Sequence, residues 1–520
     1  MERSPAIPLE APSLWTLLEA RVAATPDRMM VIDTKKKQLS FKEFLVRCER
    51  VAAGLQDLGI SEGTRVAWQL PTTIETIILS MALSRLGALQ IPIIHIYRQR
   101  ELHFIVTESK ADFLLTRSTW RGFDYSELAA DVARSIEPSP QLVVVDDIFP
   151  DGDPSTLADH PSTIDAATGA PLVRWFYYTS GTTSAPKGVQ HSDQTLIAGA
   201  LALVHIVDAQ PDDLGSIAFP FAHIGGPDYL GMVLASGMGV VVVEAFDPAE
   251  ALRLYEELGV TLAGGTTVFY TALLQEHRRH PENEFLPSLR ALVGGGAPKP
   301  SQIYYECLEE LGVPVLHGWA MTECPMLCCG AVIDSDEQRA HSEGAPVRGA
   351  DVKVVDPGAD GVGRLYVRGT MLFHGYVDPV LNKGVFDDGW FDSGDLGYLR
   401  PDGHVVIAGR GKDVIIRKGE TISAKEIEDI LYRHPKVADV AVIGVVDTSR
   451  GERVCAVVQL VDAHDSVTLE ELGDFCRAEG LINQKVPEQI EVLARLPRNA
   501  TGKIAKNQLR QQFSGMNQQS

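Results

Sequence analysis

The chain alternates between two periodicities of apolar residues. Helical spacing runs from Leu39 to Leu58 and from Thr73 to Leu89, whereas the short apolar runs Arg65 to Leu70 and Ala111 to Leu115 are typical of buried strands. Strands that alternate with helices favour a mostly parallel sheet with helices on both faces. The pattern therefore predicts an α/β architecture for this part of the chain.

The same alternation resumes after a polar stretch, residues 150–170, which is rich in Asp, Pro, Ser and Thr. We expect this stretch to separate the first part of the chain from the glycine-rich run at 178–189. The elements predicted beyond it are a helix at 192–204, a strand at 240–244, a helix at 248–258 and a strand at 261–264. The second part is therefore also expected to have layered strands and helices.

The pattern changes again near residue 350. Strands and turns at 351–356 and 363–369 indicate a compact β subdomain at about 340–409. The segments predicted after it are a strand pair, a helix at 423–432, strands at 437–446 and 452–461, and a helix at 468–479. We therefore expect a large domain, 1–409, and a small α+β domain, 410–520, joined at the flexible run Gly409-Arg410-Gly411-Lys412.

Composition narrows the class of protein. The chain has 520 residues, of which 45% are hydrophobic and 22% charged, and these values are ordinary for a globular protein. Its formal net charge of −22 argues against binding to nucleic acid, because a phosphate backbone is held by positive surface. An anionic substrate must therefore meet locally positive groups.

The sequence shows no sign of secretion or of an integral membrane segment. Its start has no apolar signal core, and the most hydrophobic stretch, 77–96, is interrupted by an arginine and a glycine. Seven cysteines form no regular framework, so reduced thiols are expected. The group Cys324, Cys328 and Cys329 lacks the paired ligands of a metal site and is read as buried thiols. We expect a cytoplasmic protein.

Residues 178–189 form a run of hydroxyls and glycines closed by one lysine. Glycine lets the main chain approach an oxyanion, hydroxyls donate to it and Lys187 adds positive charge, which is the chemistry of a nucleotide-phosphate loop. The run is not a Walker A loop, because Pro186 precedes the lysine and Gly188 follows it. Taken alone, such a run is more often a plain solvent loop.

Two later segments have features of a nucleotide site. Residues 292–298 are an apolar strand that runs into a glycine turn, where the backbone can lie flat against a planar ring. In residues 317–323, Trp319 could stack on a base and Glu323 could hold a Mg²⁺ ion that bridges phosphates. The first segment could equally be an ordinary tight turn.

Two further segments lie closer to the carboxyl end. In residues 390–397, Asp395 could accept ribose hydroxyls, although an aspartate beside glycine is usually a turn residue. Residues 498–504 place Lys503 directly after a glycine, where a lone lysine would ordinarily face solvent. Each segment has an ordinary interpretation separately, so their order along the chain is the stronger signal.

With these segments in this order, the chain resembles the adenylate-forming superfamily of acyl-CoA synthetases, peptide-synthetase adenylation domains and beetle luciferases. The matching motifs are Tyr-Thr-Ser-Gly-Thr-Thr-Ser-Ala-Pro-Lys-Gly, Met-Thr-Glu, Ser-Gly-Asp, Gly-Arg-Gly-Lys-Asp and Thr-Gly-Lys-Ile, and the resemblance covers residues 14–512. It implies a large domain of two βα-layered subdomains with a distorted β-barrel, followed by a small mobile α+β domain.

The resemblance also implies two half-reactions at one site. A carboxylate attacks the α-phosphate of ATP, pyrophosphate leaves, and a thiol such as CoA captures the acyl-adenylate. The residues implied to bind the β- and γ-phosphates are Thr179, Ser180, Gly181, Thr182, Thr183 and Lys187. Those implied around the rest of the nucleotide are Gly295, Gly296, Ala297, Pro298, Trp319, Ala320 and Met321, with Asp395 and Arg410 at the ribose.

Four residues are implied to act on the reacting groups. Thr322 would contact the α-phosphate and Glu323 would hold Mg²⁺. Lys503 would touch both the substrate carboxylate and the adenylate oxygen, and His223 would gate the acyl pocket. Rotation of the small domain about Lys412 would then remove Lys503. The same rotation would bring Lys418 and Gly419 toward the thiol tunnel.

The chain departs from the family pattern at a few positions. Ser184 stands where the phosphate loop usually has glycine, and Ala320 replaces the glycine before Met-Thr-Glu. Residues 264–268 lack the proline often found there. Because both replacements are small, nucleotide binding should survive. The missing proline, together with Gly225, Gly226, Ala320 and the cysteine group, suggests a roomy acyl pocket with little charge.

The substrate is expected to be a carboxylic acid without an α-amino group. Amino-acid-activating members hold the substrate ammonium with an aspartate where this chain has Ala222, and Asp228 lies too far along to replace it well. The segment 91–98 looks most like bacterial ligases for alicyclic or steroid-side-chain acids. Aryl and medium-chain fatty acids stay open.

Several alternatives to a CoA ligase stay open at this point. The nearest is an adenylating enzyme that loads the thiol of a separate carrier protein, and another is a sensor that binds an acyl-nucleotide without turnover. A luciferase-like monooxygenase has no supporting feature, and a serine hydrolase using Ser180 lacks the Gly-x-Ser-x-Gly motif. The expected partners are the acid, ATP and CoA, and the expected state is a monomer or homodimer.

Overall fold

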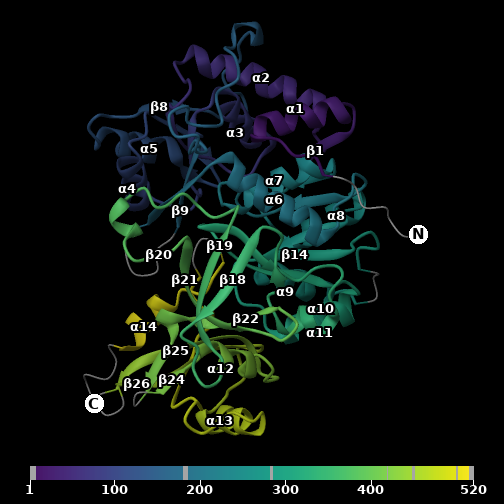
Figure 1. Ribbon diagram of the computed structural model, residues 1–520. Helices are drawn as coiled ribbons and strands as arrows, with labels where there is room; N and C mark the ends of the chain where they lie inside the picture. The colour runs from purple at the N-terminus through teal and green to yellow at the C-terminus, as the bar shows by residue number, and fades with distance from the viewer. Residues whose placement is uncertain are drawn as a thin grey trace.

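The computed structural model describes residues 8–179, 186–281, 285–417, 420–447, 451–498 and 502–514. A large part holds two sheets with their helices, and a small part holds the last strands and helices (Figure 1). A third sheet, formed by residues 350–410, lies between them. The predicted α/β architecture is confirmed.

The first sheet lies at the centre of the large part. Its spatial order is β17 (Ala345–Pro346), β16 (Cys324–Cys329), β15 (Val315–Met321), β14 (Ala291–Gly295), β13 (Leu262–Gly265), β11 (Leu214–Ile217), β12 (Gly239–Val242), β1 (Met29–Asp33) and β2 (Gln38–Ser40). The pairs from β15 across to β1 are parallel, and the pairs at both edges are antiparallel. The strands expected at 240–244 and 261–264 are confirmed as β12 and β13.

Alternate residues around β12 enter two different cores. Val240 and Val242 pack in the core that faces the second sheet, whereas Val241 and Val243 pack under α8 (Pro248–Leu258), α9 (Thr267–His277) and α10 (Ser301–Leu311). Successive side chains of a strand point to opposite faces. Burial on both faces therefore explains the continuous apolar run.

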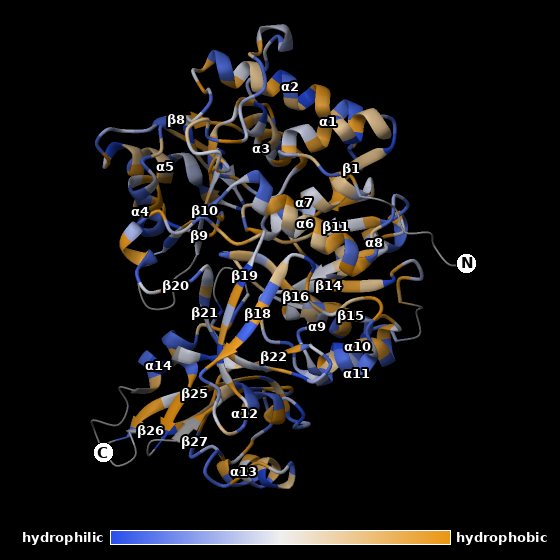
Figure 2. Ribbon diagram, in the orientation of Figure 1, coloured by the Kyte–Doolittle hydropathy of each residue, from blue (hydrophilic) through white to orange (hydrophobic). Residues whose placement is uncertain are grey.

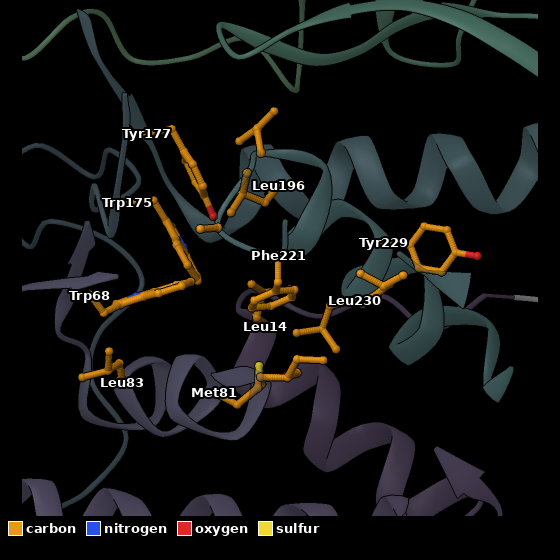
Figure 3. Close-up of a cluster of buried hydrophobic side chains, with 14 of the residues drawn as sticks. Leu14, Trp68, Met81, Leu83, Trp175, Tyr177, Leu196, Phe221, Tyr229 and Leu230 are labelled. Atoms are coloured by element: carbon orange, nitrogen blue, oxygen red, sulfur yellow. The ribbon is translucent and has the colours of Figure 1, made fainter. Parts of the chain in front are cut away.

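The other face of this sheet shares its core with the second sheet. The helices in this region are α1 (Leu14–Ala24), α2 (Phe41–Asp57), α3 (Ile74–Leu86), α6 (Asp193–Val207) and α7 (Gly225–Ser236). Figure 3 shows Trp68 and Trp175 from the second sheet in one cluster with Phe221, which precedes α7, and Leu230, which lies in α7. The two sheets are therefore held together by one continuous apolar core.

The second sheet contains strands from both sides of the polar stretch. Its order is β10 (Lys187–His191), β9 (Trp175–Thr179), β4 (Leu89–Pro92), β3 (Arg65–Gln69), β5 (Phe113–Thr116) and β8 (Gln141–Val144), with α4 (Gln99–Ser109), α5 (Tyr125–Arg134), β6 (Thr119–Trp120), β7 (Phe123–Asp124) and η1 (Pro154–Thr156) beside it. Gln90 of β4 lies opposite Trp175 of β9.

Residues 150–170 thus precede the glycine-rich run as expected, and the sheet continues across them, because β9 after the stretch pairs with β4 before it. Arg85 and Arg174 hold this stretch to the sheet by donating to the carbonyl oxygens of Ala158 (2.7 Å) and Ser162 (2.8 Å). A connection that returns to a neighbouring parallel strand must cross the surface, so it has the polar composition of a linker. Composition alone does not distinguish the two.

Local capping explains where two predicted helices begin and end. Helix α2 starts at Phe41, because residues 38–40 pair with β1 and the Ser40 hydroxyl accepts a hydrogen bond from the Glu43 amide. Helix α3 ends at Leu86, because Gly87 has a φ of 67° and terminates it. The helix expected at 248–258 is confirmed as α8.

The rest of the chain forms two smaller sheets. The third sheet contains β18 (Ala350–Val355), β19 (Gly363–Gly369), β20 (Phe386–Asp387), β21 (Trp390–Leu399) and β22 (Val405–Arg410), with α11 (Asp336–His341) and η2 (Pro379–Asn382) nearby. The small part contains η3 (Gly411–Asp413), β23 (Ile415–Arg417), β24 (Glu420–Ile422), α12 (Ala424–Leu431), β25 (Val437–Asp447), β26 (Gly451–Leu460), α13 (Leu469–Ala478), β27 (Gln489–Val492) and α14 (Lys506–Ser514).

Strand β25 organises the core of the small part. Val440 and Val442 pack with α12 and α13, whereas Ala441 and Ile443 pack with Leu509 of α14. The two long strands β25 and β26 are correspondingly apolar (Figure 2). None of the described helices combines the length and apolar character needed to cross a membrane.

A buried ion pair in the large part generates a stability prediction. Arg290 bonds to Asp213 Oδ2 over 2.7 Å, the Asp213 side chain is fully buried, and the guanidinium also donates to the Val207 carbonyl oxygen. Arg290→Met should lower the free energy of unfolding by about 3–5 kcal/mol, because it leaves a buried carboxylate uncompensated. Urea unfolding measures this loss.

The matched control is Arg134→Ala, which removes a surface ion pair with Asp131 whose arginine side chain is 71% exposed. It should change the free energy of unfolding by less than about 1 kcal/mol. Equal destabilisation by the two substitutions would contradict the structural role of Arg290.

Candidate active site

The predicted phosphate loop joins two paired strands. Thr179 ends β9 and Lys187 begins β10, and the two residues lie opposite each other in the antiparallel pair. The predicted contacts Ser180, Gly181, Thr182 and Thr183 lie outside the described residues. Lys187 Nζ lies 5.0 Å from the centroid of the Tyr376 ring. The structure thus fixes both ends of the loop and the position of its lysine.

Tyr376 links this lysine to the predicted magnesium ligand. Its hydroxyl donates to Glu323 Oε1 over 2.7 Å, while its ring faces Lys187. Burial, and then the Glu323 carboxylate, raise the pKa of Tyr376, so the hydroxyl is a neutral donor near pH 7. The sequence pattern does not single out Tyr376, because it lies 53 residues after Glu323 in the chain.

The turn that carries Thr322 and Glu323 is held in place by His191. His191 Nε2 lies 2.7 Å from the Thr322 carbonyl oxygen, and its Nδ1 lies 2.9 Å from Thr195 Oγ1. Burial lowers the pKa of His191 to about 4, so the ring is neutral near pH 7 and can donate one proton to the carbonyl. His191 is a second residue that the sequence reasoning missed.

The predicted adenine segment lies where β14 and β15 end side by side. Gly295 pairs with Gly318, and a Cβ added at Gly295 would lie 2.5 Å from the Gly318 carbonyl oxygen, so only glycine fits. Gly296 has a φ of +78° and turns the chain away. The carbonyl oxygens of Ala297 and Pro298 accept hydrogen bonds from His317 (2.7 Å) and Thr267 (2.7 Å).

The predicted ribose residues meet at one buried carboxylate. Asp395 is 4% exposed, accepts the Trp319 indole N–H at 2.8 Å through Oδ2, and lies 3.2 Å from Arg410 Nε through Oδ1. Ala320 and Met321 follow Trp319 on β15. A carboxylate oxygen has two lone pairs, so Asp395 can accept further hydrogen bonds from hydroxyls while these contacts persist.

Lys503 of the small part lies at the site of the large part. A Cβ added at Gly296 would lie 3.9 Å from Lys503 Cε. Burial and then the Lys503 charge lower the pKa of His223 to about 4. The structure therefore brings Lys503 next to Gly296, which lies far earlier in the sequence.

The predicted hinge and thiol-tunnel residues are described only in part. Lys412 lies in η3, directly after Arg410 ends β22, and its side chain is outside the described part of the structure. Lys418 and Gly419 lie outside the described residues altogether. The next residue after Lys412 is Asp413, which bonds to Arg510 of α14 over 2.7 Å. This contact ties the segment after the hinge to the last helix.

The metal donors at this site suit a hard cation held mainly by substrate. Within the described ranges, no three His, Cys, Asp or Glu side chains gather as metal ligands. The three clustered cysteines are buried, and burial raises the pKa of the Cys324 and Cys328 thiols, so they are inert. A single carboxylate such as Glu323, completed by phosphate oxygens and water, fits Mg²⁺.

Asp228, on α7, is a buried carboxyl in an apolar setting. It is 2% exposed, and its Oδ1 has no hydrogen-bond partner. That oxygen lies 3.0 Å from the position that a Cβ on Gly199 would occupy. Burial raises the pKa of Asp228 well above its ordinary value, which favours the protonated form of the group.

The fold is that of the adenylate-forming enzymes, and two family profiles match the chain. One is the AMP-binding enzyme family over residues 18–377, and the other is the AMP-binding enzyme C-terminal domain over residues 426–503. The chain belongs to the AMP-binding enzyme family. The family expected from the motifs is thereby confirmed.

The chain is similar to two enzymes that are named CoA ligases and to a solved structure of a coenzyme A synthetase. The medium-chain fatty-acid–CoA ligase of Escherichia coli (strain K12) is 31% identical over 96% of this chain and 90% of its own length. The 2-succinylbenzoate–CoA ligase of Bacillus licheniformis is 30% identical over 95% and 98%. The O-succinylbenzoate coenzyme A synthetase of Bacillus subtilis, in complex with ATP and magnesium ion, superposes with a TM-score of 0.82 at 28% identity, covering 95% of this chain and 98% of that one.

The buried Asp228 carboxyl generates a pH prediction. The folded state keeps a proton that the unfolded chain releases above about pH 4, so this group lowers stability progressively as pH rises above that value. Asp228→Asn cannot release a proton, so its stability relative to the natural protein should improve with rising pH. Thermal unfolding midpoints of both proteins between about pH 4 and 8 measure this.

The matched control is Asp131→Asn, which changes a carboxylate on the surface. Its unfolding midpoint should follow that of the natural protein at every pH. A constant difference between Asp228→Asn and the natural protein across the range would show that Asp228 is not protonated in the folded state.

Proposed function

We propose that this protein adenylates a bulky, mainly apolar carboxylic acid with ATP and transfers the acyl group to CoA. Family membership and the relatives named CoA ligases support an ATP-dependent acid–thiol ligase. The observation that carries the proposal is the position of Lys503, from the small part, beside Gly296 of the large part. This arrangement suits the first half-reaction, in which a carboxylate must approach a phosphate.

Lys503 has the main task in that step. A carboxylate and the α-phosphate of ATP repel each other, and an ammonium group between them reduces the repulsion as the new bond forms. Lys503 comes from the small part, so it can be withdrawn before the thiol attacks. Thr322, whose carbonyl oxygen lies within hydrogen-bond distance of His191, would contact the α-phosphate with its hydroxyl.

The groups around Tyr376 would stabilise pyrophosphate as it leaves. Lys187 supplies a positive charge, and the loop that begins at Thr179 supplies hydroxyls and amides. Glu323 would hold Mg²⁺, which when bound offsets the negative charge that develops as pyrophosphate departs. Trp319, Asp395 and Arg410 would hold the nucleoside.

The substrate class follows from what the acyl side lacks. Ala222 offers no carboxylate, and burial raises the pKa of Asp228 well above its ordinary value, so neither residue is suited to balance a substrate ammonium. His223 is neutral, because its pKa is about 4. Alicyclic, steroid-type or terpenoid acids, aryl acids and medium-chain fatty acids therefore fit, and the relatives that act on a medium-chain fatty acid and on 2-succinylbenzoate belong to the last two groups.

Three finer points complete the proposal. CoA is preferred to a carrier-protein thiol because the relatives are named CoA ligases. The cytoplasm supplies ATP and CoA, and the seven free cysteines are consistent with a reducing compartment. The enzyme is expected to act as a monomer or homodimer.

One experiment tests both the substrate class and the thiol. Pyrophosphate release is measured with ATP, Mg²⁺ and a panel of octanoate, benzoate, cyclohexanecarboxylate, a steroid-side-chain acid and phenylalanine, and acyl-CoA is then sought with free CoA. We expect release with at least one of the four acids and none with phenylalanine. Adenylate without acyl-CoA would favour a carrier-protein thiol, and binding of acyl-nucleotide without any release would favour the sensor.

Lys503→Ala should separate the two half-reactions. Acid-dependent ATP–pyrophosphate exchange should fall by about 10²- to 10³-fold, because a preorganised charge is lost. Thioester formation from supplied acyl-adenylate and CoA should stay within about twofold, since Lys503 is then withdrawn. Lys383→Ala, at an exposed lysine, is the control and should change neither rate. Equal loss of both half-reactions would contradict the assigned role.

Glu323→Gln should change the metal dependence of the first half-reaction. The amide keeps the shape of the side chain and can still accept from Tyr376, but it loses the charge that binds Mg²⁺. The Mg²⁺ concentration for half-maximal pyrophosphate exchange should rise by about tenfold or more. Glu309→Gln, on the exposed side of α10, serves as the control. An unchanged magnesium titration would exclude Glu323 as the ligand.

A further inference from the structure

A hydrogen-bonded network around the buried carboxylate of Asp439 in the small part ends at the residue before Lys503. Arg498 Nη1 donates to the Gly502 carbonyl oxygen over 2.6 Å, and Nη2 bonds to Asp439 Oδ2. Asp439, near the start of β25, is 7% exposed. Its Oδ1 accepts the Tyr432 hydroxyl at 2.8 Å and the Val440 amide at 2.9 Å. One carboxylate therefore joins the end of α12 to the Gly502 turn.

Backbone contacts also join the two chain segments on either side of this turn. Arg498 and Ile504 form an antiparallel bridge, and the Ala505 amide donates to the Pro497 carbonyl oxygen over 2.7 Å. These contacts fix where the turn starts and ends, whereas the Arg498 guanidinium fixes the peptide that leads into Lys503. Without it, the described contacts hold the base of the turn but not the Gly502 carbonyl.

Both ends of the network meet the large part. Tyr432 packs against the apolar cluster under α8, α9 and α10 as well as against the core of the small part. A Cβ added at Gly502 would lie 3.4 Å from Val268 Cγ2 and 3.9 Å from Thr266 Oγ1, at the start of α9. The network thus reaches two places at which the small part contacts α9 and its neighbours.

We propose that Arg498, oriented by Asp439 and Tyr432, is a positioning residue that fixes the Gly502–Lys503 peptide when the small part docks. Lysine is a point charge on a flexible four-carbon stem, so its tip is only as well placed as its backbone. A displacement of about 1 Å at a reacting group can cost about 10²-fold in rate. This inference rests on the proposed role of Lys503 in adenylation.

Arg498→Ala tests the proposal through the separate half-reactions. The acid that is most active in the pyrophosphate-release panel serves as substrate. We expect kcat for acid-dependent ATP–pyrophosphate exchange to fall by roughly 10- to 100-fold with little change in the KM for ATP. Thioester formation from the supplied adenylate should stay within about twofold, because that step does not use Lys503.

Two conservative variants keep the test informative if Arg498→Ala is unstable. Arg498→Lys retains the charge but cannot hold Asp439 and Gly502 together as a planar fork, so it should give an intermediate loss of exchange. Asp439→Asn keeps an oxygen for Tyr432 and should lower exchange in the same selective way. Arg433→Ala, which removes an exposed ion pair with Glu479 next to Tyr432, is the control and should change neither rate.

The possible outcomes separate this inference from the proposed function. If Lys503→Ala abolishes exchange but all Arg498 and Asp439 variants retain it, the positioning role is wrong while the function stands. If these variants lose both half-reactions equally, their contribution is to folding and the inference is also wrong. If Lys503→Ala itself leaves exchange unchanged, the proposed mechanism fails first.

Discussion

Lys503 reaches the proposed nucleotide site only because the small part of the chain docks against the large part. Its Cε lies next to the position that a side chain on Gly296 would occupy, and the preceding residue rests against Thr266 and Val268. An ammonium group held permanently between carboxylate and phosphate would stay in the way of an incoming thiol. A separate support that can rotate allows the same charge to be present for one step and absent for the next.

The rest of the site is fixed by the core between the two sheets. Thr179 ends β9, Gly295 ends β14 and the Thr322–Glu323 turn follows β15, so three functional segments leave the carboxyl ends of strands. Because one apolar core joins both sheets, these strand ends cannot move independently. The contact from Tyr376 to Lys187 and Glu323 then connects the second sheet to the first.

Much of the fold and of the candidate site could be predicted from the sequence. The features that could not be predicted share a physical cause. Helix α8 and strand β12 follow from local periodicity, and the positions of Trp319, Asp395 and Lys503 follow from motifs. Tyr376 and His191 act through contacts with residues far along the chain, which no local pattern records. The pairing of β4 with β9 across a polar stretch could not be predicted either, because composition reports exposure and not pairing.

The net charge of the chain also fits an anionic substrate once local fields are considered. A total of −22 would repel ATP at long range, but charges more than about 8–10 Å apart in water are largely screened at physiological salt. Around the proposed site the structure has Lys187, Arg410 and Lys503. These three side chains supply the local positive charge that an anionic substrate would meet. One of them belongs to the docked small part, so the affinity of the site for anions should depend on its orientation.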